Sequence, residues 1–532
     1  MELRAPDLVT LYSDGAVMCS RGEGIREDRA SVRYEMENDG LRVFVKSALG
    51  VRYLRMDWAC TRGSDVKVLG DAWERSYGNL AWNTVCPERC MPWYMAISNG
   101  SDQDPDTTHR FTECFGVGVQ PNSLAFWQYT GDFLTLWLDI RNGGMSTLLG
   151  ERELCAATVY FREYLGVRAF SAVRDFARVM SWQPRLASHK VFGSNNWYYA
   201  YGKSSQEEIL NDTRLIVSLC ERAQGKPYMV IDDGWQPNSC DAPWDRGNKS
   251  FPDMAGLARK MKALGARPGI WVRCLVNAKK SELTKDINDR AQLYLSKNPN
   301  VLDPSHPEVI EYVSNTVKRF VDWGYELIKH DYTAYDILGG YCNGRRDTAT
   351  DDGWCFYDRT RTTAEIIKGL YSAIQESAGD AIVIGCNTIS HLCAGIHQLN
   401  RTGDDTSGRD FQRTLTMGVN TLAFRLPQHN SFYGVDADCV GITEKIPWEK
   451  NRQWLELLAR SSTPLFVSVK PDLLSEEQTE ELKDAFAVAS LQEDEMIPVD
   501  WMETTTPSRY LVNGKEVRFK WYTEKGNESF AP

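Results

Sequence analysis

Histidine is scarce in this sequence, with 7 among 532 residues, and no HExxH motif or Ser/His/Asp pattern stands out. This argues against zinc peptidases and serine hydrolases, which need histidine at defined positions. Cys86 and Cys90, in CPERC, have a zinc-like spacing, but no second pair matches them. We therefore expect no essential metal and no cofactor.

The sequence also lacks a surplus of basic residues, because its formal net charge is −11. This argues against nucleic acid or an anionic membrane as partner, since both attract basic surfaces. No run approaches the roughly 20 apolar residues of a membrane span. Residues 1–10 lack the apolar segment of a signal peptide, so we expect a cytoplasmic protein whose 14 cysteines are reduced.

The chain is too long for one ordinary domain, and its pattern changes along its length. Up to residue 185 it is β-rich, with short alternating runs such as 41–45 and 134–138, so we predict an N-terminal β-sandwich domain. Residues 186–492 form the predicted catalytic domain. Residues 493–532 are left as a short C-terminal β segment, with a hairpin around Asn513-Gly514.

From about residue 190, β-type runs alternate with amphipathic helices, which is typical of βαβ units around a parallel sheet. One helix is expected to begin at Ser205 and to close by Gly225, and another to begin at Ser305 and to end at Gly324. The expected strands are 195–200, 228–232, 269–274, 326–331, 381–386, 397–401, 420–424 and 435–440.

Eight such steps predict an α/β fold of the (β/α)8 TIM-barrel type, which typically needs about 250 residues. A doubly wound open sheet is the alternative. No Gly-rich phosphate turn follows the first expected strand to support it.

Polar side chains gather where these strands end, and in a barrel the carboxyl ends of the strands carry the chemistry. The strand ends hold Asp232 and Asp233; Trp271 and Arg273; Lys329 and Asp331; Cys386 and Asn387; and Arg401, Asp404 and Asp405. Each motif alone would be a turn, a helix cap or a buried thiol. Together, at successive strand ends, they predict an active site.

Two of these carboxylates match the pair that glycoside hydrolysis requires, one to attack and one to protonate the leaving oxygen. We predict Asp331 as nucleophile and Asp405 as acid/base. Lys329 lies two residues before Asp331 and so points to the same side, where its charge would keep Asp331 ionised. Asp232 and Asp233 can each accept hydrogen bonds from sugar hydroxyls.

With these residues in place, the chain resembles glycoside hydrolase family 36, within the α-galactosidase superfamily of retaining glycosidases. The motifs that carry the resemblance are GDAWERSYGNLAW (70–82), VIDDGWQ (230–236), GIWVR (269–273), LDPSHPEV (302–309), IKHD (328–331), GCN (385–387) and RTGDD (401–405). They span most of the chain, and their order and spacing are more specific than any single motif.

The resemblance implies a β-supersandwich before the barrel and double displacement with retention. It implies Asp331 as nucleophile and, four residues after Arg401, Asp405 as acid/base, with Asp404 as the runner-up. Other implied roles follow: Asp232 and Asp233 would hold the O4 and O6 hydroxyls, Trp197 and Trp271 would line the pocket, Lys329 and Arg401 would bind further hydroxyls, and Cys386 would lie near O2.

The sequence departs from the family pattern in two places. Arg273 stands where many relatives carry an acidic residue, and the C-terminal segment is too short for a full β-sandwich. Relatives also bring a tryptophan from the N-terminal domain to the site, sometimes in a neighbouring subunit, which leaves a homo-oligomer open. Trp73, Trp82 and Trp93 are the candidates for that tryptophan.

The leading hypothesis is an exo-acting α-galactosidase whose substrate is an α-galactoside oligosaccharide. The alternative of an α-N-acetylgalactosaminidase, acting on α-N-acetylgalactosaminides, depends on the loop 386–393, where Asn387 and Thr388 suit either sugar. A transglycosylase of the raffinose or stachyose synthase type is a second alternative. A non-hydrolytic sugar-binding relative is a third, and the presence of both Asp331 and Asp405 argues against it.

Overall fold

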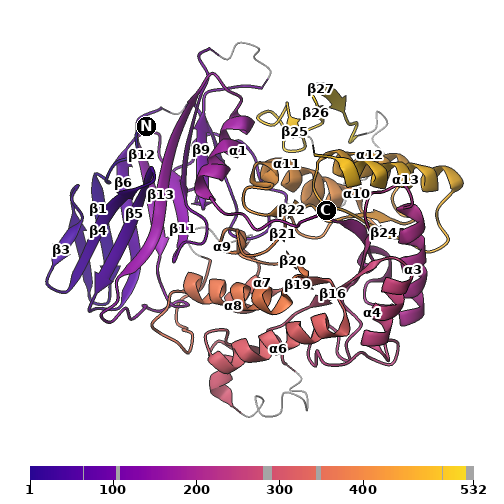
Figure 1. Ribbon diagram of the computed structural model, residues 1–532. Coiled ribbons are helices and arrows are strands. Elements are labelled where there is room, and N and C mark those ends of the chain that lie inside the picture. Colours follow the sequence, from indigo (N-terminus) through magenta and orange to yellow (C-terminus); the bar gives the residue numbers. More distant parts are fainter. Residues whose placement is uncertain (64, 103–107, 279–289, 343–348, 494, 523–532) are drawn as a thin grey trace.

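The computed structural model describes residues 1–532 apart from 64, 103–107, 279–289, 343–348, 494 and 523–532. Two antiparallel sheets make up the N-terminal part, a curled parallel sheet with surrounding helices follows, and a small antiparallel sheet lies near the C-terminus (Figure 1). None of the helices in the described ranges combines the length and the apolar character of a membrane span.

The N-terminal part contains one sheet of six strands and one of seven, and every strand pairing in them is antiparallel. The six-stranded sheet consists of β1 (Leu8–Ser13), β2 (Ala16–Ser20), β6 (Val51–Ala59), β8 (Met91–Pro92), β11 (Leu124–Tyr129) and β12 (Phe133–Asp139). The seven-stranded sheet consists of β3 (Ile25–Glu27), β4 (Ala30–Glu37), β5 (Gly40–Ser47), β7 (Lys67–Gly70), β9 (Tyr94–Ser98), β10 (Phe111–Val117) and β13 (Leu154–Leu165).

Alternating side chains explain how the two sheets meet. In β5, Leu41, Val43 and Val45 are buried on one face while Lys46 is exposed, as the two-residue period of a strand requires. Trp58 of the six-stranded sheet packs edge-on against Phe161 of the seven-stranded sheet, with 5.3 Å between ring centroids. The apolar faces of the two sheets therefore contact each other.

The parallel sheet has nine strands in the order β22-β21-β20-β19-β16-β15-β14-β24-β23. Its strands are β14 (Phe192–Asn195), β15 (Tyr228–Ile231), β16 (Arg267–Val272), β19 (Leu327–His330), β20 (Ile382–Gly385), β21 (Leu399–Arg401), β22 (Gly434–Asp436), β23 (Cys439–Ile442) and β24 (Leu465–Val469). The two edge strands, β22 and β23, are separated only by Ala437 and Asp438, so the sheet curls until its edges adjoin in the chain.

Amphipathic helices cover the outside of this sheet (Figure 1). The longer ones are α3 (Gln206–Leu219), α4 (Met254–Ala263), α6 (Pro307–Trp323), α8 (Thr363–Ala378), α12 (Trp448–Arg460) and α13 (Glu476–Leu491). Shorter segments lie between strands: α2 (Trp197–Ala200), η2 (Ala291–Leu293), α7 (Thr333–Leu338), α9 (Ser390–Cys393), α10 (Phe411–Arg413), the π-helix η4 (Thr414–Asn420), α11 (Thr421–Arg425) and η5 (Leu426–Gln428). A two-stranded sheet of β17 (Tyr294–Leu295) and β18 (Asn298–Leu302) precedes α6.

The helix starts follow the capping chemistry of the sequence. The Ser205 side chain accepts from the backbone N–H of Glu208 at 3.3 Å, as predicted, but α3 ends at Leu219, well before Gly225. His306 rather than Ser305 caps α6, because Pro307 occupies its first turn. Gly324 ends α6 as predicted, at a φ of 104° that favours glycine.

Most expected strands of the parallel sheet are found within a few residues, and two expectations are wrong. The first strand lies at Phe192–Asn195, and most of the expected 195–200 is the short helix α2. The expected strand 420–424 belongs to a helical stretch that includes η4 and α11. Short apolar runs such as Leu422–Phe424 do not distinguish a strand from a buried helix. The strand that was missed is β24, which pairs with β14 and β23.

The C-terminal sheet consists of β25 (Met496–Pro498), β26 (Arg509–Val512) and β27 (Lys515–Arg518), and it confirms the predicted hairpin. Asn513 and Gly514 have φ values of 52° and 72°, the left-handed pair of a tight hairpin turn. Trp501 packs against Trp82, and also against Phe170 in helix α1 (Ala169–Met180) and Phe424 in α11. This one side chain therefore ties the C-terminal segment to both other parts.

Candidate active site

The predicted site residues do gather at one edge of the parallel sheet. Asp232 follows β15, Trp271 lies near the end of β16, Asp331 follows β19, and Cys386 follows β20. Arg401 is the last residue of β21. Because the strands are parallel and neighbouring, their carboxyl ends meet, and these side chains share one rim.

The Asp331 carboxylate is oriented by two donors, one on each oxygen. The indole Nε1 of Trp271 donates to Oδ2 at 3.2 Å, and the backbone N–H of Tyr332 donates to Oδ1 at 2.7 Å. Tyr332 reaches this position because its φ is 60°, a left-handed conformation that turns the chain directly after β19. The buried Trp271 therefore acts on the carboxylate through its N–H group.

Lys329 forms its direct ion pair with Asp232, whereas the sequence predicts that its charge acts on Asp331. The Lys329 Nζ lies 2.6 Å from Oδ2 of Asp232, and the Nδ2 of Asn195 donates to the same oxygen at 2.6 Å. Burial alone would lower the pKa of Lys329, but Asp232, with a smaller contribution from Asp331, raises it well above its ordinary value. Lys329 therefore stays charged, with Asp232 as its direct partner and Asp331 as a more distant one.

Asp233 is engaged by its own loop. Its Oδ1 accepts from Gln236 Nε2 at 2.6 Å and from the backbone N–H of Cys240 at 3.1 Å, and its Oδ2 accepts from the Cys240 thiol at 2.8 Å. The two adjacent aspartates thus have different surroundings. Asp232 belongs to the cluster inside the rim, and Asp233 organises the loop that follows β15.

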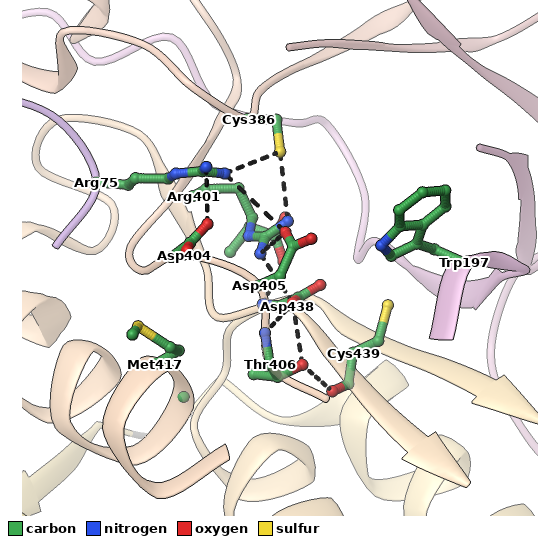
Figure 2. Close-up of polar contacts among 12 residues, drawn as sticks. Arg75, Trp197, Cys386, Arg401, Asp404, Asp405, Thr406, Met417, Asp438 and Cys439 are labelled. Atoms are coloured by element: carbon green, nitrogen blue, oxygen red, sulfur yellow. Dashed lines mark hydrogen bonds and ion pairs between the residues drawn. The ribbon is translucent and has the colours of Figure 1, made fainter. Parts of the chain in front are cut away.

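Asp404 and Asp405 are distinguished by their contacts (Figure 2). Asp404 forms two close ion pairs, each at 2.7 Å, with Arg75 and Arg413, and its side chain is 18% exposed. Asp405 lies 3.3 Å from Arg401 and 4.0 Å from Arg75, and its side chain is 37% exposed. Asp405 is therefore the more accessible carboxylate and the one less tightly engaged by cations.

Arg401 connects Asp405 to the interior. Its guanidinium lies 2.8 Å from Asp438 and donates to the Cys386 sulfur at 3.4 Å (Figure 2). Asp438 in turn accepts from the backbone N–H of Thr406 at 2.8 Å and from the Tyr198 hydroxyl. This network anchors the loop that carries Asp405.

The cations around Asp405 act on its ionisation. Burial alone would raise the pKa of Asp405, but Arg401, Arg75, Lys329 and Arg413 outweigh burial and hold the pKa below its ordinary value. A general acid must be protonated before it can donate. The cations therefore favour the ionised form of Asp405.

Trp197 lies on the opposite side of Asp405 from Arg75 (Figure 2). It opens the short helix α2, where its backbone N–H donates to Oδ1 of Asn195 at 2.7 Å. Its ring is half-buried and packs near Tyr201, with 5.5 Å between centroids. The position and partial exposure suit a pocket wall.

The residue that sequence reasoning missed is Arg75. It belongs to segment 70–82, and nothing in the local pattern of that segment indicates a role for Arg75. Backbone bonds dock this segment on the loop after β21: Ser76 N–H donates to Thr402 O at 2.8 Å, and Asp404 N–H donates to Ser76 O at 3.0 Å. Only the tertiary structure brings Arg75, more than 300 residues earlier in the chain, to Asp404.

The three candidate tryptophans lie elsewhere. Trp73 and Trp93 pack edge-on against each other, with 5.3 Å between centroids, and Trp82 packs against Trp501. All three are buried in these aromatic contacts. Among the residues that the structure describes, Arg75 is the side chain of segment 70–82 that contacts the carboxylates of the rim.

No group of three or more histidine, cysteine, aspartate or glutamate side chains in the described part of the chain is arranged to hold a metal ion. The 14 cysteines all lie in the described ranges, and none of them forms a disulfide bond.

Comparisons with known proteins bear on the fold. No family model and no curated protein matches the chain. An α-galactosidase from Thermus thermophilus, solved with p-nitrophenyl α-D-galactopyranoside, aligns with a TM-score of 0.61 at 18% identity over 93% of this chain and 99% of that one. The family 36 α-galactosidase AgaB from Geobacillus stearothermophilus aligns with a TM-score of 0.58 at 14% identity over 94% of this chain and 78% of that one.

A variant of a second Geobacillus stearothermophilus family 36 α-galactosidase, in complex with 1-deoxygalactonojirimycin, aligns with a TM-score of 0.57 at 14% identity, over 93% of this chain and 73% of that one. The chain therefore shares the fold of family 36 α-galactosidases.

Proposed function

We propose that this protein is a retaining exo-α-glycosidase that releases terminal α-linked galactose from oligosaccharides or glycoconjugates. The observation that carries the proposal is one rim with two separately held carboxylates, Asp331 and Asp405, next to the buried Asp232–Lys329 pair. The shared fold supports it, because relatives with this fold have been crystallised with galactosides such as stachyose and raffinose.

The proposed reaction is a double displacement. Asp331 attacks the anomeric carbon and forms a glycosyl ester, while the glycosidic oxygen takes a proton from Asp405 and leaves with the aglycone. Asp405, now ionised, then accepts a proton from water as the water oxygen attacks the ester, which releases the sugar and restores Asp331 as a carboxylate. The Trp271 and Tyr332 donors hold Asp331 in position for attack.

Asp232 is proposed to bind the hydroxyls of the galactose ring, with Lys329 and Asn195 fixing its carboxylate. Asp233 is proposed to bind a hydroxyl while shaping the loop after β15. Trp197 and Trp271 would line the pocket, and Arg401 and Cys386 would face C2.

The surroundings of Cys386 favour galactose over N-acetylgalactosamine. Its sulfur lies 3.4 Å from Arg401 and 3.9 Å from Arg75, and the thiol is fully buried. An acetamido group on C2 needs more space than a hydroxyl. Because Arg401 and Arg75 already contact the Cys386 sulfur, we propose the smaller hydroxyl as the C2 substituent.

For the fold, we propose a closed (β/α)8 barrel in residues 186–492, in which β22 and β23 are one strand interrupted at Asp438. Asp438 has a φ of 74°, and both flanking strands pair with their neighbours in parallel. The two N-terminal sheets in residues 1–185 would then be the β-supersandwich, and residues 493–532 the short C-terminal segment.

The test is a pair of initial rates, on p-nitrophenyl α-galactoside and on p-nitrophenyl α-N-acetylgalactosaminide. We expect turnover of the galactoside with a clear preference over the second substrate. Following the anomeric proton of the released sugar by NMR should show the α-anomer first. Release of β-galactose first would contradict retention, and no release from either substrate would contradict the proposed activity.

A further inference from the structure

The short helix α7 begins directly after the proposed nucleophile, and its position sets one of the two donors to the Asp331 carboxylate. That donor is the backbone N–H of Tyr332, 2.7 Å from Oδ1. Tyr332 is also the residue before the first turn of α7, and its φ of 60° is a left-handed conformation that bulky residues rarely adopt unless their surroundings impose it. Whatever fixes the N-terminal end of α7 therefore also fixes this donor.

The N-terminal end of α7 takes its hydrogen-bond acceptors from another strand end. The first N–H groups of a helix have no partner within the helix, and the side chain of Tyr332, at the cap position, makes no capping bond. Asn387, fully buried after β20, accepts in its place. Its backbone oxygen accepts from the N–H of Ala334 at 3.0 Å, and its Oδ1 accepts from the N–H of Tyr335 at 2.9 Å. Asn387 is therefore the cap of α7, supplied by a distant segment.

A buried glutamate holds Asn387 in the orientation that this cap needs. Because Tyr335 offers an N–H, the Asn387 amide must turn its oxygen toward α7 and its Nδ2 away from it. Nδ2 then donates to Oε2 of Glu74 at 2.6 Å. Glu74 is 1% exposed, and its Oε1 accepts from the backbone N–H of Cys342 at 3.0 Å and from the Tyr77 hydroxyl. Both oxygens of Glu74 thus serve as acceptors, and they stabilise this orientation of the amide against the flipped one.

The fold does not depend on this contact alone. The backbone of Ser76 bonds to the loop after β21, so segment 70–82 is also tied to the sheet at a second point. Helix α7 is held on its other side by Arg273, which follows β16 and forms a fork-like pair with Asp336, at 2.5 Å at its shortest. Disturbing Glu74 should therefore leave the fold in place and loosen one end of α7.

We propose that Glu74 is a positioning residue for the proposed nucleophile, Asp331. Glu74 orients Asn387, Asn387 caps α7, and α7 places the Tyr332 N–H that holds the attacking carboxylate. This inference rests on the proposed glycosidase function. The N-terminal part then acts on the nucleophile through Glu74, as it acts on the acid/base through Arg75. A small misplacement of the attacking atom slows the reaction much more than it weakens sugar binding.

The experiment exchanges the two polar groups that meet. In Glu74→Gln, either orientation of the new amide turns its NH2 group toward an N–H donor, of Cys342 or of Asn387. In Asn387→Asp, two buried carboxylates face each other. In the double variant, the amide at position 74 can donate to the carboxylate at position 387, whose other oxygen still accepts from the Tyr335 N–H. The double variant therefore restores the contact with its direction reversed.

The wild type and the three variants are assayed as full-length proteins on p-nitrophenyl α-galactoside, with galactose as competitive inhibitor. We expect each single variant to lower kcat/KM about tenfold or more, and the double variant to recover most of the loss. The inhibition constant of galactose should change far less, because binding does not require the attack. Glu151→Gln, at a fully exposed position of the N-terminal part, is the matched control and should behave as the wild type.

Thermal unfolding distinguishes positioning from a general loss of structure. If Asn387→Asp fails to fold, Glu74→Gln and the double variant still give the comparison. Single variants as active as the wild type, a double variant without recovery, or a galactose inhibition constant that rises as much as kcat/KM falls would each overturn the positioning role alone. No turnover of the galactoside by the wild type would overturn the proposed glycosidase function and this inference with it.

Discussion

The two ends of the rim are built in different ways. The end with Asp232 is made within the parallel sheet: Asn195, Lys329 and Trp271 lie in β14, β19 and β16 and contact the carboxylates directly. The end with Asp405 depends on residues far apart in sequence, because Arg75 comes from the N-terminal part. The contacts at the Asp232 end follow from the order of the strands in the sheet and the direction in which their side chains point. The contacts at the Asp405 end form only when the N-terminal part docks on the sheet.

Docking of the two parts is specific. Arg425, fully buried, pairs with Asp71 at 2.9 Å and donates to the backbone oxygen of Glu74 at 2.6 Å. A buried arginine destabilises the fold unless its N–H groups find acceptors. Asp71 and the backbone oxygen of Glu74 are acceptors for Arg425, so they fix where segment 70–82 docks on the sheet. We therefore expect substitutions at the Asp232 end to change sugar binding and the attack of Asp331 on the anomeric carbon. Substitutions at the Asp405 end should change proton transfer.

The largest expected effect is at Asp331. Asp331→Asn should fold normally and lower kcat on p-nitrophenyl α-galactoside by about a thousandfold or more, because the amide cannot form the ester. Circular dichroism and initial rates check this. Asp322→Asn, at a surface position whose side chain is 60% exposed, is the matched control and should keep full activity. Near-wild-type activity of Asp331→Asn would remove Asp331 as nucleophile.

The second-largest expected effect depends on the leaving group of the substrate. Asp405→Asn should lower kcat/KM on raffinose by about 10² to 10⁴, as expected for loss of a general acid, and far less on p-nitrophenyl galactoside, whose phenolate departs with little proton help. Steady-state kinetics on both substrates measures the ratio. Asp404→Asn is the control. If it reproduced the pattern while Asp405→Asn lowered both substrates equally, the acid/base would be Asp404.

A third prediction concerns the Asp232–Lys329 pair. Asp232→Ala leaves the Lys329 ammonium buried without its partner, which should cost about 3–5 kcal/mol of folding stability and raise KM through lost hydroxyl contacts. Thermal unfolding and KM for the galactoside measure the two consequences. Asp232→Asn keeps an acceptor for Lys329 and should lose less stability. An Asp232→Ala variant as stable as the wild type would show that Lys329 finds another partner.

The smallest expected effect is a shift of the pH profile. As general acid, Asp405 must be protonated in free enzyme, so kcat/KM is lost as pH rises through its pKa. Burial raises that pKa, and Arg401, then Arg75, lower it, so the wild type should be most active in acid. Removing the charge in Arg75→Gln should raise the pKa of Asp405 and move the alkaline limb to higher pH.

The control for this shift is Arg222→Gln, at a surface position 41% exposed whose ion pairs lie far from Asp405 in the chain. Its pH profile should match that of the wild type. An alkaline limb that stays in place in Arg75→Gln would mean that Arg75 does not act on the acid/base.

Much of the parallel sheet could be predicted from the sequence. Strands such as β15, β16 and β19 are short apolar runs bounded by polar turns, and their ends carry Asp232, Trp271 and Asp331. Where the local signal is ambiguous, prediction failed. The sequence of Leu422–Phe424 predicts a strand, but the segment is helical. The sequence did not predict β24, which pairs with β14.

Sequence alone determined which residue types stand at the strand ends, because strand period and turn chemistry are local properties of the chain. The sequence places Asp331 two residues after Lys329, and Asp405 four residues after Arg401. Only the tertiary structure decided that Lys329 pairs with Asp232, that Arg75 reaches Asp404, and that Tyr77 joins Tyr341. Ion pairs and ring contacts form between segments that packing brings together, and no spacing along the chain encodes them.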